Sequence, residues 1–235
     1  MKSPGKFSVP IFYLIVAFAC VPVSAQLNIV GYNSTNPNGP TGAPSPDLPA
    51  AEFQSQVTPL LLSRGAGLVP NQGITFNSRD WSLASTLNTS LTDYVQWGWS
   101  ASTANFNLEN MTIQYDRSGS GPTRLSIQLS VNGGAYQSIF DDPDVNLGDE
   151  THTINLTSFD DINSASFRLF GYNASSLGGT LDIERFNSDP DPSRAIVVRG
   201  FFASVPEPGS LGLIMISLAV TMSTRRRRMA GIQNG

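Results

Sequence analysis

Residues 124–139, RLSIQLSVNGGAYQSI, decide the class of fold. Apolar side chains stand at every second position from 125 to 131 and alternate with polar ones, so a strand would place them on one face. Asn132-Gly133-Gly134 follows at once, and an Asn-Gly pair accepts the positive φ that a tight hairpin turn needs. The stretch therefore predicts a β-hairpin with one buried face.

The same alternation recurs on both sides of this hairpin, and clusters of Gly, Pro, Asn, Asp and Ser separate its instances. No sustained 3.6-residue stripe is present, apart from a helical turn or two expected within 49–63. Eight or so strands with regular turns predict an all-β fold, an antiparallel two-sheet sandwich of the jelly-roll type. Besides the hairpin, we expect strands near 27–32, 93–99, 108–115, 151–156, 166–172, 180–184 and 195–202.

Charge is distributed unevenly along the chain. The segment 26–204 contains 17 Asp and Glu against 8 Arg and no Lys, a net charge of −9. Such a domain is repelled by phosphate backbones, so no nucleic acid is expected as a partner, and the excess of carboxylates favours solubility. The single cysteine, Cys20, lies in the first apolar run. Once that run is removed, neither a disulfide nor a thiolate metal site is available.

Residues 1–25 have the parts of a secretory signal peptide. Lys2 and Lys6 precede an apolar run over 9–21, and about 13 apolar residues suit a signal core better than a membrane span. Small residues end the segment, so cleavage is expected after Ala25, leaving Gln26 as the first mature residue. The alternative is a lipoprotein acylated at Cys20, but a bulky Phe18 stands where a small residue is preferred.

The segment 205–235 contains a second targeting signal. Val205-Pro206-Glu207-Pro208 leads into an uncharged apolar run over 209–224. As a helix this run reaches roughly 24 Å, short of a hydrocarbon core of about 30 Å but workable with thinning or snorkelling. The expected membrane-anchoring residues are Leu211, Leu213, Ile214, Ile216, Leu218 and Val220.

A block of four arginines follows the apolar run directly: Arg225, Arg226, Arg227 and Arg228. Positive charges beside a membrane span favour the cytoplasmic side, so all four are expected to form a cytoplasmic anchor. This orientation places 26–204 outside the membrane.

The order of a Pro-Glu-Pro motif, a short apolar helix and an arginine cluster resembles the PEP-CTERM sorting signal of Gram-negative bacteria. In that family an exosortase, a membrane protease-transpeptidase, is thought to recognise the motif and cut near it. The resemblance implies the secretion machinery, the exosortase and the inner membrane as partners. It also implies a final place at the cell surface or in the extracellular polysaccharide matrix. The alternative, a plain tail anchor, shares this topology but keeps the anchor.

The segment 26–204 is similar, more loosely, to the jelly-roll, carbohydrate-module-like domains of exported bacterial proteins. The "strand, Asn-Gly-Gly, strand" hairpin and the strand Phe-Arg-Leu-Phe-Gly-Tyr at 167–172 carry this resemblance, which implies a fold rather than an activity. Trp97 and Trp99 alternate with Gly98, so both rings face the same way. If exposed they would form a platform for sugars, and if buried they would fill the core, which we favour.

Few residues indicate catalysis. His152 is the single histidine, and its threonine neighbours predict an exposed strand position. Nucleophile-elbow, His-Glu-x-x-His and phosphate-loop motifs are missing from the sequence. Asp182 and Glu184 would share one strand face, as a glycosidase carboxylate pair could, although a solvated strand face has the same pattern.

The acidic cluster around Asp141, Asp142 and Asp144, with Asp149 and Glu150 nearby, could supply oxygen ligands to a structural calcium ion. We expect no other cofactor. The leading hypothesis is thus an exported surface or matrix protein without catalytic activity. The alternative is a carbohydrate-binding module, and a glycoside hydrolase ranks third.

Overall fold

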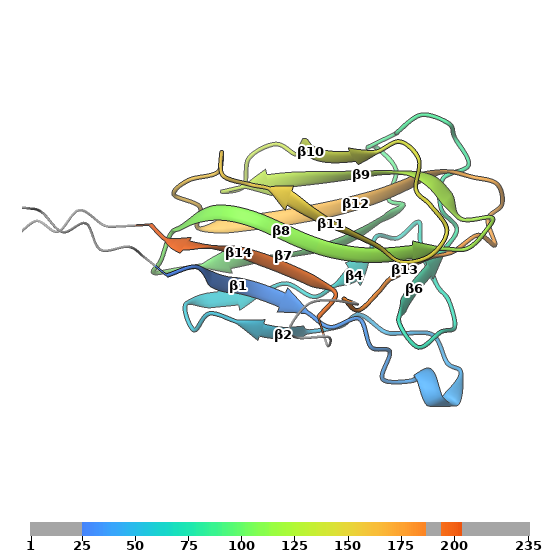
Figure 1. Ribbon diagram of the computed structural model, residues 1–235, viewed down its shortest axis with the longest axis horizontal. Helices are drawn as coiled ribbons and strands as arrows, with labels where there is room; N and C mark the ends of the chain where they lie inside the picture. Colours follow the sequence, from blue (N-terminus) through green and yellow to red (C-terminus); the bar gives the residue numbers. More distant parts are fainter. Residues whose placement is uncertain (1–24, 187–193, 204–235) are drawn as a thin grey trace, which may run out of the picture.

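The computed structural model describes residues 25–186 and 194–203 as two antiparallel sheets packed face to face (Figure 1). The predicted two-sheet all-β sandwich is confirmed. Most of the expected signal peptide and the whole segment 205–235 lie outside the described residues. Within them, no helix has the length and apolar character needed to span a membrane.

The first sheet has β8 (Phe106–Arg117) at its centre. One edge of β8 pairs with β11 (Glu150–Asn155), and the other pairs first with β14 (Ile196–Phe202) and then with β13 (Leu181–Ile183). Two short series of strands extend the sheet beyond β14 and β13. They are β1 (Leu27–Tyr32) and β2 (Ala50–Phe53) beyond β14, and β6 (Phe76–Arg79) and β5 (Val69–Pro70) beyond β13.

The second sheet has the order β10, β9, β12, β7, β3, and β4 pairs with a further part of β7. Its strands are β10 (Gln137–Asp142), β9 (Pro122–Val131), β12 (Ser164–Ala174), β7 (Tyr94–Ala101), β3 (Val57–Pro59) and β4 (Ser63–Arg64). The predicted hairpin joins β9 to β10. Asn132 and Gly133 have φ of 51° and 72°, and Gly134 N–H donates to Val131 O at 2.9 Å. This is the tight turn that the Asn-Gly pair predicts.

The core lies between the sheets and contains the apolar residues that alternate along β9, since Leu125, Ile127 and Leu129 are all fully buried. Burying each such side chain contributes about 1.5–3 kcal/mol to stability. Tyr32 is buried too, and its hydroxyl bonds to the carbonyl oxygens of Leu60 and Gly98 at 2.8 Å.

The expected helical turn within 49–63 is wrong. Ala50–Phe53 and Val57–Pro59 are strands, and Ser63 begins another. Edge positions on the two sheets determine this outcome, because each short strand takes its hydrogen bonds from a longer neighbour. The single described helix is a 3-10 turn, Gly39–Thr41, in a stretch of the sequence that is rich in proline.

Both boundaries of the domain lie at one end of the sandwich. β1 and β14 are antiparallel neighbours, and Leu27 is paired with Gly200 (Figure 1). The two ends of the described domain therefore lie side by side. The turn between β8 and β9 is at the opposite end, because Phe106 pairs with Phe202 and β8 runs away from that pair.

Candidate functional site

The two tryptophans on β7 lie in the core. Trp97 and Trp99 are 0% and 1% exposed, and the Trp97 ring stacks on Phe167 of β12 with centroids 5.5 Å apart. Their rings face the same way, as the alternation predicts, but that way is inward. The alternative that these two residues form a sugar platform is therefore wrong, because neither ring reaches the surface. They fill the core, as we favoured.

The opposite face of the same sheet carries a row of polar side chains. Arg168 on β12 is paired directly with Gln128 on β9 and Gln96 on β7. Their strand neighbours point into the core, so these three half-buried side chains point outward. Gln96 Nε2 also donates to Ser63 Oγ at 3.1 Å, which orients its amide.

Two tyrosines flank this row. The guanidinium carbon of Arg168 lies 4.4 Å from the ring centroid of Tyr94 and 4.1 Å from that of Tyr136, two cation–π contacts. The Tyr136 hydroxyl is 2.8 Å from Ser166 Oγ on β12, so this ring, which follows the hairpin turn, lies across β9. We define the tyrosine–arginine face as Tyr94, Gln96, Gln128, Tyr136 and Arg168.

This face combines aromatic rings with amide and guanidinium groups, the chemistry that binds the apolar faces and the hydroxyls of sugars. Sequence reasoning missed it. The outward positions of Gln96, Gln128 and Arg168 were available from the alternation, but their alignment depends on strand register. Tyr136 is outside any strand, so its position over the sheet had no sequence signal.

Asp182 and Glu184 do not form the solvated face that their spacing suggested. Thr75 Oγ1 donates to Glu184 Oε1 at 3.2 Å and also contacts the Asp182 carboxyl. Burial, and then the nearby charges of Glu184 and Asp116, raise the pKa of Asp182 to about 7. Burial likewise raises the pKa of Glu184. The pair can therefore hold a proton near neutrality, as an acid–base catalyst or a purely structural pair would.

The three aspartates expected to bind calcium are not brought together. Asp141 is exposed and accepts a bond from Ser138 Oγ at 3.0 Å, whereas Asp142 is buried on the other side of β10 and accepts one from Tyr115. Asp144 contributes its backbone N–H, which donates to Asp142 Oδ1 at 3.1 Å. This grouping was wrong because adjacent residues of a strand face opposite ways.

His152 is not simply exposed. Its ring is half-buried, stacked against Tyr115 with centroids 5.3 Å apart and tilted against Phe140 at 4.9 Å. Its strand position on β11 was predicted correctly, but the face was not.

The predicted targeting residues lie at or beyond the limits of the described chain. Ala25 and Gln26, on either side of the expected signal cleavage, are exposed just before β1. The other predicted residues fall outside the described ranges. They are the sorting motif Val205, Pro206, Glu207 and Pro208, the anchoring residues Leu211, Leu213, Ile214, Ile216, Leu218 and Val220, and the cytoplasmic arginines Arg225, Arg226, Arg227 and Arg228.

Comparison with known proteins gives one family match and a set of distantly similar structures. Residues 204–228 match the model described as the PEP-CTERM protein-sorting motif. No curated protein matches the chain. Solved structures with a similar β-sandwich include a carbohydrate-binding module of family 29, 9% identical, with a TM-score of 0.37 over 80% of this chain and 98% of that one. A mutant of CBM29-2 complexed with mannohexaose is 8% identical, with a TM-score of 0.36 over 75% and 92%.

Proposed function

Because residues 204–228 carry the PEP-CTERM sorting motif, we propose that this protein is exported, anchored briefly in the inner membrane, and then processed by an exosortase. Its final place is the cell surface or the extracellular polysaccharide matrix, where the domain acts without catalysis. The family match carries this proposal. The signal-peptide pattern over 1–25 and the cluster of Arg225, Arg226, Arg227 and Arg228 support the same topology.

The position of the domain boundaries is compatible with this sequence of events. The start of β1 and the end of β14 lie together at one end of the sandwich, where Leu27 pairs with Gly200. The segments that lead to both expected targeting signals therefore start from the same place. Neither cleavage removes a strand, because β1 begins at Leu27 and β14 ends at Phe202. The sandwich can therefore be complete before, between and after the two processing steps.

The test is cell fractionation with mass measurement of the mature protein, in cells with and without the exosortase. We expect a shortened chain outside the inner membrane when the enzyme is present, and membrane-bound protein that keeps 205–235 when it is absent. Replacing Pro206-Glu207-Pro208 by alanines should reproduce the second result, whereas Pro143→Ala, at an exposed turn, should not. Identical masses and locations in both strains would refute the sorting proposal.

Absence of catalysis is tested separately. Asp182 and Glu184 are the pair with raised pKa values that an acid–base enzyme would use. We expect the purified protein not to release reducing sugar from matrix polysaccharides. Release that disappears in Asp182→Asn would overturn the non-catalytic part of the proposal and leave the sorting part intact.

A second candidate function is carbohydrate binding, favoured by the tyrosine–arginine face. Its aligned Gln96, Arg168 and Gln128 can exchange hydrogen bonds with sugar hydroxyls, and the two tyrosine rings add apolar surface. The face covers the outside of the sheet, where an extended polysaccharide could lie across strands. It would give a matrix protein a direct attachment to its surroundings.

A glycan array tests this candidate. Binding should fall at least about tenfold in Arg168→Ala and in Tyr136→Ala if the guanidinium and the oriented ring contact sugar, since lost contacts in a desolvated site remove more than about 1.4 kcal/mol each. Trp97→Phe is the matched control, because Trp97 is buried on the other side of the sheet. Binding that survives both face substitutions would exclude this surface.

A further inference from the structure

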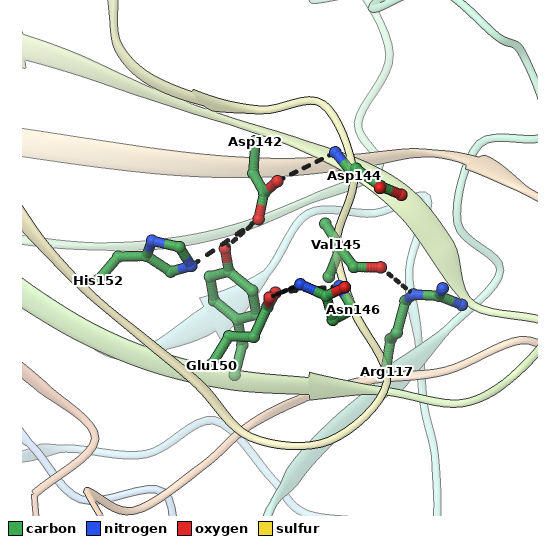
Figure 2. Close-up of polar contacts among 8 residues, drawn as sticks. Arg117, Asp142, Asp144, Val145, Asn146, Glu150 and His152 are labelled. Atoms are coloured by element: carbon green, nitrogen blue, oxygen red, sulfur yellow. Dashed lines mark hydrogen bonds and ion pairs between the residues drawn. The ribbon is translucent and has the colours of Figure 1, made fainter.

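Three side chains with metal-ligand atoms meet where β10 of the second sheet approaches β11 of the first. Asp142 is the last residue of β10, and Glu150 and His152 lie on one face of β11 (Figure 2). A carboxylate oxygen of Asp142, one of Glu150 and a ring nitrogen of His152 all lie within 4.8 Å of one another. We call these three residues the β10–β11 cluster.

The carboxylates of the cluster are held in place by their neighbours. The buried hydroxyl of Tyr115 donates to Asp142 Oδ2 at 2.8 Å, and Asp144 N–H donates to Asp142 Oδ1 at 3.1 Å. The backbone N–H of Asn146 donates to Glu150 Oε2 at 3.2 Å, and the side-chain amide of Asn146 bonds to the other oxygen of Glu150. Partners of this kind fix the orientation of metal ligands.

The imidazole ring of His152 is held in position by its neighbours, but one of its nitrogens has no hydrogen-bond partner. Two rings, Tyr115 and Phe140, contact His152. Its Nε2 atom is buried and has no hydrogen-bond partner. The nearest carboxylate atom of Asp142 is 3.8 Å away, beyond hydrogen-bond range but directed at the same space (Figure 2). A buried polar atom without a partner needs an explanation, and a role as a metal ligand supplies one.

We propose that the β10–β11 cluster binds one divalent transition-metal ion of the zinc type. One imidazole nitrogen with two carboxylates suits zinc, whereas calcium takes six to eight oxygen ligands. The His152 and Asp142 side chains are 29% and 11% exposed, so the cluster lies close to the surface, where water could complete the coordination of the ion. This goes beyond the sorting function and does not depend on it.

The bound ion would connect the two sheets at an edge of the sandwich. Asp142 belongs to the second sheet, and Glu150 and His152 to the first. The loop 143–149 joins them. Within it, Val145 is buried, its N–H donates to Thr123 O at 3.0 Å and its carbonyl accepts a bond from Arg117 Nε at 2.7 Å, while Gly148 N–H donates to Asp116 Oδ1 at 3.0 Å. Binding should therefore stabilise the folded chain as the concentration of the ion rises.

The competing explanation is an ion pair between a protonated His152 and the two carboxylates. Calorimetry on the full-length protein, purified in detergent and stripped with a chelator, distinguishes the two. We expect one Zn²⁺ bound per chain, and little heat from Ca²⁺. Co²⁺ in place of zinc should give visible absorption bands, which an ion pair cannot produce.

Matched variants locate the site. His152→Gln and Glu150→Gln should each weaken zinc binding at least about tenfold, while Asp141→Asn and Asp144→Asn leave it unchanged. Circular dichroism of each variant establishes that it is folded, and a zinc-dependent rise in Tm should be seen in the wild type and in the two aspartate controls alone. Absence of zinc binding to the wild type, or equal affinity in the His152 and Glu150 variants, would overturn the proposal.

Discussion

At the scale of single residues, the carboxyl of Asp182 has a strongly raised pKa. Its carboxyl lies on the side of β13 opposite the core, beside Glu184 and Asp116, and its Oδ1 atom is buried without a hydrogen-bond partner. Arg64 is near enough to attract it, but the side chain of Arg64 is itself half-buried and bonds to Ser78 and to the Asn77 carbonyl. The negative charge of Asp182 is thus incompletely compensated.

Stability should therefore decrease as pH rises. The pKa of Asp182 is about 7 in the folded state against an ordinary 3.8, so between these values the folded state holds a proton that the unfolded state has released. Unfolding free energy from urea titrations should fall by on the order of a few kcal/mol from pH 4 to pH 7. Asp182→Asn should flatten this slope and stabilise the protein at neutral pH. Asp160→Asn, at an exposed site, should leave the slope unchanged, and parallel curves for wild type and Asp182→Asn would contradict the prediction.

At the scale of elements, β7 depends on a glycine. Gly98 has φ of 154°, and a Cβ there would lie 2.1 Å from the carbonyl oxygen of Ala165 on β12. The carbonyl oxygen of Gly98 accepts a hydrogen bond from the buried Tyr32 hydroxyl, and the Gly98 N–H donates one to the same hydroxyl. One residue thus joins the second sheet to a strand of the first, between two core tryptophans.

Gly98→Ala should destabilise the domain by more than about 3 kcal/mol, because backbone on β12 cannot move aside cheaply. Thermal or urea unfolding measures this. Gly119→Ala is the matched control, since a Cβ there meets nothing within 4 Å, and it should change stability by less than about 0.5 kcal/mol. Equal stability of the two variants would show that β7 and β12 can separate locally.

Elements also show where sequence reasoning succeeds. The hairpin at 124–139 was predictable because period-two alternation and an Asn-Gly turn agree there. Between 49 and 63 no strand is longer than four residues, too few for a period to be visible. Two members of the β10–β11 cluster could be grouped from the sequence, since Glu150 and His152 are two apart on one strand. Its third member, Asp142, faces them only because the loop 143–149 passes from one sheet to the other.

For the molecule as a whole, the described strands form a complete unit up to Ala203, whose N–H donates to Asn105 O at 2.8 Å. A chain ending at Ala203 should therefore unfold with the same free energy as the full-length protein. A chain ending at Ala195 loses β14, which lies between β1 and β8, and should not fold. Circular dichroism and urea unfolding of both truncations check this, and a folded shorter chain would contradict it.

The pairing of β14 on both edges has a mechanical consequence. Tension applied at Phe202, along the axis of the strand, pulls against its hydrogen bonds to β1 and β8 together. These two rows would have to slide in shear, so many bonds share the load at once instead of opening one after another. A pull on the segment that follows β14 would thus be resisted by both rows at the same time.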